Sequence, residues 1–335
     1  MPKFPIYDIS DVEQIDFEQM GTKSKFWYKN DQNELFLFKA TLTTDKEGND
    51  IQRYGEDWAE KIACEITKLL NIPAANYDLA TFRGQAGIIT KNFVGAKENM
   101  LYGNSIISHL ENILENNSYS PLTETKVDTQ TSNEKHDVTN IFVCLENFVK
   151  NKPLNWDSLP QIKTAIDVFA GYLMFDTLIS NQDRHNENWG MIYASMNHTY
   201  LAPSFDHAAS LGRNESDEKR LIRLTTTDKG QTVASYVNKA KSQIIDEATG
   251  RRLSTIYAFE VFGRCFALDA SCSWINQLKL VDNEQLKSIV WSIPDSIITE
   301  ISRQFAYNII IENKMRILDL QTSFIAAKKK EPDNE

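Results

Sequence analysis

The sequence predicts an α+β fold with two lobes, a small β-rich N-terminal lobe with one main helix and a larger C-terminal lobe that is mostly helical. Short β-rich runs dominate the chain before residue 94, whereas helical periodicities dominate after it. Such segregation of strands and helices along a chain is typical of α+β proteins. The length of 335 residues at 38.4 kDa allows one two-lobed molecule. We expect the first lobe at residues 1–94, the second at 95–327 and a charged tail at 328–335.

Composition and charge narrow the classes of partner. The chain is 41% hydrophobic and 24% charged, with 9 Pro and 13 Gly, which is ordinary for a globular protein and excludes a collagen-like or low-complexity chain. Its 46 acidic residues against 36 basic ones leave a net charge of -10. A surface this negative repels the phosphates of nucleic acid and of anionic membranes, so we expect neither as a direct partner.

Cysteine usage and hydropathy indicate the compartment. The four cysteines, Cys64, Cys144, Cys265 and Cys272, form no C-x-x-C pair, which disfavours both a disulfide scaffold and a structural zinc site. Residues 1–19 are acidic without an apolar run, and no segment is long and apolar enough to cross a membrane. We therefore expect a cytoplasmic protein without a secretion signal. Whether it acts in its own cell or is delivered into another is left open.

Local patterns define the elements of the small lobe. Residues 25–40 read as a β-hairpin, because two β-rich runs flank a polar turn, and Lys39 lies near the end of the second strand. Apolar side chains recur every three or four residues across 55–70, which predicts an amphipathic helix. Two further strands are expected at 77–82 and 88–93.

The first part of the large lobe is interpreted as helical, with one interruption. Helices are expected at 140–149 and 162–178, and the second of them carries apolar residues at helical spacing. The stretch 116–138 is rich in Asn, Ser, Thr and charge. We expect it to be a solvated loop.

The second part of the large lobe begins with a hairpin. Two β-rich runs at 189–193 and 199–202 are separated by a short turn. Helical patterns return over 237–327, and the longest helix is expected at 297–318.

The densest group of chemically active residues lies between the helix at 162–178 and this hairpin. The loop contains Asp183 and Asn188, and Asp206 follows the second hairpin strand. Because a hairpin returns its second strand to the place where its first began, we expect these three side chains to converge. Their hard oxygen ligands are few, which suits a divalent metal that is shared with phosphates.

This order of parts is the one that protein-kinase-like enzymes use for phosphoryl transfer. In that scheme Asp183 orients the attacking hydroxyl and accepts its proton, while Asn188 and Asp206 hold Mg²⁺ against the nucleotide. A strand lysine must contact the phosphates, and a helix carboxylate must hold that lysine. The chain offers Lys39 and Glu60 in the required order.

Several of these assignments have alternatives. Glu56 and Glu65 share the predicted helix with Glu60, so either could take its place. Lys39 could be a solvated lysine of an edge strand. His185 and His207, beside the proposed catalytic and metal-binding residues, are interpreted as buried histidines that shape their loops.

The sequence resembles the HipA-like serine/threonine kinases, a family that includes bacterial toxin kinases. The resemblance covers about residues 21–318 and rests on DTLISNQDRHxxNWG at 176–190, on LAPSFD at 201–206, and on Glu60 within AEKIACEI at 59–66. It implies a protein-kinase-like fold, ATP and Mg²⁺ as cofactors, a protein substrate with a Ser or Thr acceptor, and an antitoxin as a candidate partner.

The resemblance also assigns roles to residues. It implies that Asp183 is the catalytic aspartate and that Asn188 and Asp206 bind magnesium. The residues that it places around the nucleotide are Gly21, Thr22, Lys23 and Ser24 in the phosphate loop, Lys39 at the phosphates, Lys91, Asn92 and Phe93 in the adenine-binding hinge, and His185.

The chain departs from the usual kinase pattern at three points. The loop at 19–25 has one glycine where most protein kinases have three, and Asp206 is followed by His207-Ala208 rather than Phe-Gly. The chain begins only 38 residues before Lys39, so we expect a short form of the family without its additional N-terminal subdomain. By analogy with the family, Ser24 or Thr22 is a candidate site of autophosphorylation.

The sequence therefore predicts an ATP- and Mg²⁺-dependent serine/threonine protein kinase, with a toxin or effector role as one form of that function. Two alternatives stay open. Phosphatidylinositol kinases use a similar Asp-Arg-x-x-x-Asn element, so a lipid or small-molecule kinase is one, although the net charge of -10 disfavours docking on an anionic membrane. The other is a non-catalytic binding module, a pseudokinase that acts through a partner.

Overall fold

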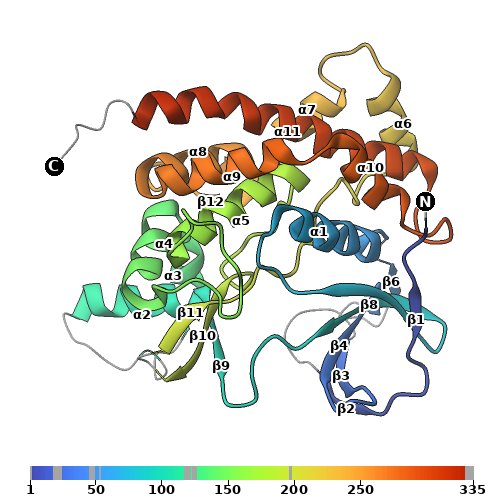
Figure 1. The fold of residues 1–335 in the computed structure, drawn as a ribbon, viewed down its shortest axis with the longest axis horizontal. Coiled ribbons are helices and arrows are strands. Elements are labelled where there is room, and N and C mark those ends of the chain that lie inside the picture. The colour runs from blue at the N-terminus through green and yellow to red at the C-terminus, as the bar shows by residue number, and fades with distance from the viewer. Residues whose placement is uncertain are drawn as a thin grey trace.

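The computed structural model describes residues 2–17, 25–44, 50–52, 54–116, 122, 127–195 and 198–328. The small lobe is built on a six-stranded sheet with the order β1-β7-β8-β4-β3-β2 (Figure 1). Its strands are β1 (Ile6–Asp8), β2 (Gln14–Phe17), β3 (Lys25–Lys29), β4 (Leu35–Ala40), β7 (Tyr77–Phe82) and β8 (Gln85–Lys91). All neighbours are antiparallel except β1 and β7, which are parallel. Strands β5 (Leu42–Thr44) and β6 (Asp50–Gln52) form a separate pair.

The predicted hairpin at 25–40 is confirmed as β3 and β4. Its turn is closed by the Asn30 side chain, whose Oδ1 accepts the backbone N–H of Glu34 at 2.8 Å. Alternate residues of the hairpin face one side of the sheet, where Phe26 and Phe38 pack against Phe82 of β7. This aromatic cluster explains why a β-rich pattern was readable in the sequence.

The strand expected at 88–93 is shifted. Strand β8 spans Gln85–Lys91 because it pairs with β7 on one side and with β4 on the other, and its last β4 pair is Phe36 with Lys91. The chain leaves the sheet at that point, so Asn92 and Phe93 follow the strand. Strands β1 and β2 were not predicted, because they are only 3 and 4 residues long.

Helix α1 (Glu56–Leu70) confirms the predicted helix at 55–70. Asn71 ends it in the left-handed conformation, with φ of 52°. The helix lies between the sheet and the helical lobe (Figure 1), and its apolar side chains, including Trp58, Ile62 and Ile66, belong to one hydrophobic core with residues of the large lobe. The boundary between lobes near residue 94 stays a prediction.

The hairpin predicted at 189–202 is confirmed as β10 (Gly190–Ser195) and β11 (His198–Leu201). A third strand that was not predicted, β9 (Asn99–Tyr102), pairs with β10. A Cβ atom on Gly190 would lie 2.3 Å from the carbonyl oxygen of Leu101 in β9, so this close approach of two strands requires glycine.

The first helices of the large lobe are α2 (Gly103–Asn116), α3 (Thr129–Glu134), α4 (Val138–Cys144), which continues as a π-helical turn at Leu145–Val149, and α5 (Ala165–Ile179). The helices predicted at 140–149 and 162–178 are thus confirmed within a few residues; a capping box of Thr164 and Asp167 sets the start of α5. The expectation of a plain loop at 116–138 was wrong in part, because α3 lies within it. Asp128 caps α3 by accepting the N–H of Thr131.

The remaining elements are α6 (Asp217–Thr225), α7 (Val233–Asn238), β12 (Lys241–Ile245), β13 (Arg252–Ser254), α8 (Thr255–Phe266), α9 (Leu268–Leu280), α10 (Asn283–Trp291) and α11 (Glu300–Lys328). The last helix was predicted at 297–318 and continues to Lys328, because Phe324 is buried against Phe259 of α8. The β12–β13 hairpin interrupts a stretch that was predicted to be helical. Among the described residues, no helix combines the length and apolarity of a membrane span.

Candidate active site

The loop that carries Asp183 begins where the buried helix α5 ends. Ser180 ends α5 in the left-handed conformation, with φ of 50°. Asn181 then ties the turn together, because its Nδ2 donates to Asp176 Oδ1 at 2.8 Å and its Oδ1 accepts the backbone N–H of Asp183 at 3.2 Å. The position of Asp183 is thus set by side chains that are buried at the end of α5.

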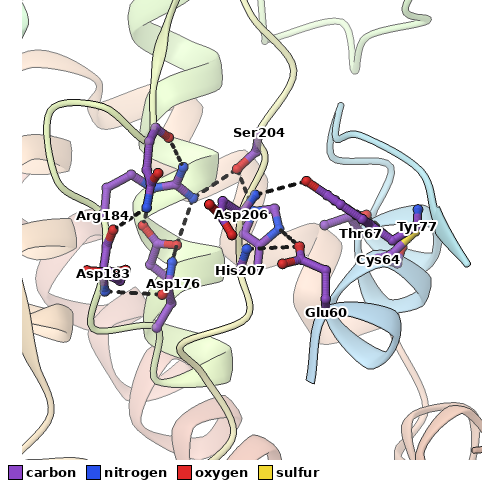
Figure 2. Close-up of polar contacts among 12 residues, drawn as sticks. Glu60, Cys64, Thr67, Tyr77, Asp176, Asp183, Arg184, Ser204, Asp206 and His207 are labelled. Atoms are coloured by element: carbon purple, nitrogen blue, oxygen red, sulfur yellow. Dashed lines mark hydrogen bonds and ion pairs between the residues drawn. The ribbon is translucent and has the colours of Figure 1, made fainter. Parts of the chain in front are cut away.

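Arg184 holds this loop from inside the protein. Its fully buried guanidinium makes two hydrogen bonds of 2.8 Å to the Asp176 carboxylate, and it also donates to the carbonyl of Asn188 at 2.6 Å and to Ser204 Oγ at 2.9 Å. Burial alone would lower the pKa of Arg184, but the charge and hydrogen bonds of Asp176 raise it above its usual value. The charged guanidinium therefore joins α5, both ends of the loop and the segment before Asp206 (Figure 2).

Asp183 and Asn188 lie together, as the sequence predicted. Asn188 Nδ2 donates to the backbone carbonyl of Asp183 at 2.7 Å. Asp206 follows β11 in a left-handed turn with φ of 58°, and its Oδ2 lies 3.4 Å from Lys39 Nζ. The predicted strand lysine and the predicted metal-binding aspartate thus face each other across the two lobes.

One pocket gathers most of the predicted site residues. Its volume is about 240 Å³, and its lining comes from the small sheet, the segment after β8, strand β9, the loop at 185–188 and the segment at 205–206. The predicted residues that line it are Lys39, Lys91, Asn92, Phe93, His185, Asn188 and Asp206. Asp183 does not line the pocket, but its backbone carbonyl is hydrogen-bonded to the side chain of Asn188, which does line it.

The pocket has an apolar part and a polar part. Phe93 and Phe205 lie with ring centroids 5.7 Å apart, and Leu37 and Met100 add aliphatic surface. Lys39, Asn188 and Asp206 supply charge and oxygen atoms in the same pocket. A planar base with a phosphate chain fits this division of surface.

The oxygen donors of the pocket suit a metal that is shared with phosphates. Across the described residues, no cluster of three His, Cys, Asp or Glu side chains could enclose a metal by itself. Magnesium is usually held by one or two carboxylates together with water and substrate phosphates. The amide of Asn188 and the carboxylate of Asp206 fit that requirement.

Glu60 differs from its predicted role. We expected it to hold Lys39, but its Oε1 accepts the backbone N–H of His207 at 2.9 Å and lies 3.2 Å from His207 Nδ1. The ion pair of Lys39 is with Asp206 instead. The reason is the residue after Asp206: a histidine there presents a ring nitrogen and a backbone N–H to the buried helix carboxylate.

His207 itself is buried, as predicted, and links two parts of the site. Its Nε2 lies 2.7 Å from Ser204 Oγ, and its ring packs edge-on against Phe175 of α5. A continuous chain of polar contacts therefore runs from Asp176 through Arg184, Ser204 and His207 to Glu60 on α1 (Figure 2).

Tyr77 is a site residue that sequence reasoning missed. Its hydroxyl accepts the backbone N–H of Asp206 at 3.3 Å, and Lys39 Nζ lies 5.8 Å from its ring centroid. Burial raises the pKa of the Tyr77 phenol well above its usual value, and the charges of Glu60 and Asp206 add to this effect. No local signal distinguishes a tyrosine at the start of a strand, so only the packing could reveal it.

The predicted phosphate loop and His185 are the remaining residues that were expected to contact the nucleotide. Gly21, Thr22, Lys23 and Ser24 lie outside the described residues. Lys25, the first residue of β3, lines the pocket. His185 was expected to be buried, but it is only half-buried because it lines the pocket, and its Nδ1 accepts the backbone N–H of Glu187 at 3.1 Å.

Comparison with known proteins identifies the family. A family model described as the HipA-like C-terminal domain matches residues 2–258. The chain belongs to the HipA-like C-terminal domain family. This HipA-like chain is 22% identical to the serine/threonine-protein kinase CtkA of Helicobacter pylori (strain J99 / ATCC 700824) over 308 residues, which cover 90% of this chain and 81% of that protein.

Solved structures agree with this family. The crystal structure of a Helicobacter pylori proinflammatory kinase CtkA matches the HipA-like chain with a TM-score of 0.70 at 19% identity, covering 96% of this chain and 99% of that one. HipA of Shewanella oneidensis MR-1, solved with HipB and its operator DNA, matches with a TM-score of 0.52 at 11% identity, covering 95% and 68%. The predicted family and the two-lobed, kinase-like α+β fold are confirmed.

Proposed function

We propose that this protein is an ATP- and Mg²⁺-dependent serine/threonine protein kinase of the HipA-like type. The observation that carries the proposal is the convergence of Lys39, Asn188 and Asp206 on one pocket, with Asp183 bonded to Asn188. The name of the relative CtkA supports a Ser or Thr acceptor on a protein.

The roles of the chain's own residues follow from their positions. Asp183 accepts the proton of the acceptor hydroxyl as its oxygen attacks, and the contacts of Arg184 and Asn181 keep the Asp183 backbone in place. Asn188 and Asp206 hold the metal, and Lys39 contacts the phosphates. When bound, ATP would supply the γ-phosphoryl group and leave as ADP, and Mg²⁺ would compensate the negative charge on the phosphates.

The adenine site is assigned to the last residue of β8 and the segment that follows it. Lys91, Asn92 and Phe93 form the hinge, and Phe205 packs against the base from the large lobe. We assign the loop of Gly21, Thr22, Lys23 and Ser24 to the phosphates, because Lys25, which follows it, already lines the pocket. His185, from the loop that contains Asp183, also contacts the nucleotide in this assignment.

The wider role is also part of the proposal. The match to a HipA that was solved with HipB supports an antitoxin-type partner and a toxin or effector role. Cysteine usage supports a cytoplasmic location. The division into lobes at residue 94 is retained as the boundary between the nucleotide-binding sheet and the catalytic loop.

Transfer of labelled phosphate from ATP tests the proposed function. Asp183→Asn and Asp206→Asn should each lower transfer to protein by about a hundredfold or more, because each removes a charge that is needed in the transition state. Circular dichroism checks that both variants fold. Mass spectrometry of the wild-type reaction should find phosphate on Ser24 or Thr22 if the protein autophosphorylates.

The choice of acceptor separates this proposal from its alternatives. Wild-type protein should label mixed protein substrates and leave phosphoinositides unlabelled. Preferential labelling of phosphoinositides would favour a lipid kinase, and tight ATP binding without any transfer would favour a pseudokinase. Transfer at the wild-type rate by either variant would end the assignment of the site.

A further inference from the structure

A second hollow lies on the large lobe, and it is lined by the start of α4, the β12–β13 hairpin and α8. Its volume is about 440 Å³. Its apolar surface comes from Val138, Ile245, Leu253, Tyr257 and Val261, and its acidic side chains are Asp246 and Glu247. Tyr257 is 48% exposed. We call this hollow the acidic groove.

One wall of the acidic groove is bonded directly to the catalytic loop. Gln182 precedes Asp183, and its backbone carbonyl accepts a hydrogen bond from Gln243 Nε2 at 3.1 Å. The Gln182 side chain also accepts the backbone N–H of Lys241 at 3.4 Å. Strand β12 therefore connects Gln182, the residue before Asp183, with the groove, because Ile245 and Asp246 at the end of the strand line the groove.

The opposite wall is bonded to the same loop. His136 lies two residues before Val138, and its Nε2 accepts a hydrogen bond from Trp189 Nε1 at 3.1 Å. Its carbonyl accepts the backbone N–H of Ile245 at 3.0 Å, which joins the two walls. In addition, Asn186 Nδ2 donates to Ser132 Oγ of α3 at 3.1 Å. The groove and the catalytic loop thus share one hydrogen-bonded framework.

The groove carries negative charge that nothing in its lining offsets. The lining contains Asp246 and Glu247 and no Lys or Arg. Burial raises the pKa of the neighbouring Asp137, and the charge of Glu247 contributes to the same rise. Arg251 and Arg252 belong to the same hairpin, but they are exposed and do not line the groove. A cationic side chain beside an apolar one would complement this surface.

Strand geometry relates the groove to the acceptor site. Gln243, which contacts the catalytic loop, and Ile245, which lines the groove, are two residues apart in β12 and both belong to its less buried side. Asp246 comes three residues after Gln243, and three residues of extended chain span roughly 10 Å. A peptide that runs beside β12 would therefore reach the acidic side chains a few residues from its phosphorylated hydroxyl.

We propose that the acidic groove binds an extended segment of the protein substrate, with a basic side chain at Asp246 and Glu247 and an apolar side chain on Tyr257 and Leu253. These two side chains lie about three to five residues from the Ser or Thr acceptor. This inference rests on the proposed function for its catalytic consequence. The binding itself does not require phosphoryl transfer and is measured without ATP.

Fluorescence anisotropy of labelled peptides tests the binding. The probes are short alanine-based peptides with a central Ser, in which an Arg-Leu pair is moved along the chain, together with matched peptides that carry Glu-Leu. Wild-type protein should bind the Arg-Leu peptides more tightly, with an optimum three to five residues from the Ser. The double variant Asp246→Asn/Glu247→Gln should weaken this binding about tenfold, and Tyr257→Ala should weaken it by a similar factor.

A separate hollow with basic side chains in its lining provides a matched control. Lys219, Arg223 and Lys239 line it on the α6–α7 side of the large lobe. The control variant Lys219→Gln/Lys239→Gln also removes two charges and should bind the Arg-Leu peptides as the wild type does. Unchanged binding by the groove variants, or a preference for Glu-Leu peptides that the control variant abolishes, would overturn the proposal.

Kinetics separate this inference from the proposed function. If the protein is a kinase, the groove variants should raise KM for Arg-Leu peptides about tenfold and leave kcat unchanged, because the groove does not touch the reacting atoms. Groove-dependent binding without any transfer would support the groove and contradict the kinase. Efficient transfer with a KM that is the same in the wild type and the groove variants would contradict peptide binding by the groove and support the kinase activity.

Discussion

At the scale of single residues, buried polar groups decide the shape of the site. Arg184 is fully buried, and its guanidinium makes four hydrogen bonds to Asp176, Asn188 and Ser204. Removing one partner of such a network leaves a buried charge unpaired, which typically costs about 3–5 kcal/mol. His136 has a comparable position in the adjoining framework, because its ring contacts Trp189 and the carbonyl of Gln243.

The buried His136 predicts a pH dependence of stability. Burial lowers the pKa of His136 to about 3 in the folded protein, from an ordinary value near 6.5. Between these values the unfolded chain binds a proton that the folded protein does not, so stability is lost as the pH falls below 6.5, by about 1.4 kcal/mol per pH unit.

The variant His136→Gln isolates this contribution. The free energy of unfolding of the wild type minus that of the variant should shrink by about 2 kcal/mol between pH 6.5 and pH 5. Urea denaturation at the two pH values measures it. A difference that does not change with pH would show that His136 titrates alike in the folded and unfolded chains.

At the scale of elements, α1 is connected to the segment that contains Asp206, the proposed metal ligand, by a contact that the usual kinase pattern does not contain. Glu60 accepts from His207 rather than pairing with Lys39, and its Oε2 is buried without a hydrogen-bond partner among the described residues. We infer that Glu60 is a positioning residue. It orients the turn after Asp206 and thereby the Asp206 carboxylate.

Two substitutions of Glu60 distinguish positioning from an ion pair with Lys39. Glu60→Gln keeps an oxygen that can accept the His207 N–H, so phosphate transfer should stay within a few-fold of the wild type. Glu60→Ala leaves that N–H unsatisfied and should cost about 1–3 kcal/mol of stability along with most of the activity. Steady-state kinetics and urea denaturation provide the two readouts. Equal loss of activity in both variants, together with a changed KM for ATP in both, would favour the ion pair.

At the scale of the whole molecule, the two lobes share a hydrophobic core. One cluster of buried residues extends from Trp58 of α1 and Leu79 of β7 through Phe169 of α5 to Phe324 of α11. Lobes that share such a core cannot unfold separately without exposing apolar surface on both sides. The shared core therefore does not indicate two separately stable units, and the boundary at residue 94 stays a prediction.

Calorimetry tests this view of the core. Heat should unfold the protein in one transition, with a calorimetric enthalpy equal to the van't Hoff enthalpy, because α1 cannot leave the core without disrupting α5. Trp58→Ala, in the small lobe, should lower the midpoint of that single transition by several degrees, because Phe or Trp truncation in a core costs about 3–5 kcal/mol. Two resolved transitions, of which only one responds to Trp58→Ala, would show independent lobes.

The sequence alone was sufficient where the information is local. Alternating aromatics predicted the β3–β4 hairpin, helical spacing predicted α1 and α5, and the spacing of Asp183, Asn188 and Asp206 predicted their convergence, because hairpin geometry returns one strand beside the other. Strands such as β1 and β9 could not be predicted. They are only three or four residues long, and they exist because distant strands pair with them.

The sequence by itself thus determined the class of fold, the order of the catalytic parts and the family that this order indicates. Only the tertiary structure decided which partner each buried charge has. Glu60 was the predicted carboxylate, with Glu56 and Glu65 as alternatives on the same helix, and its contact with His207 depends on how α1 packs against the turn after Asp206. The acidic groove likewise joins segments around residues 138, 246 and 257, which become neighbours only when the core between them is formed. Pairing and packing between distant segments reduce both the buried unpaired charge and the exposed apolar surface. Because these contacts join residues far apart in the chain, no local sequence pattern predicts them.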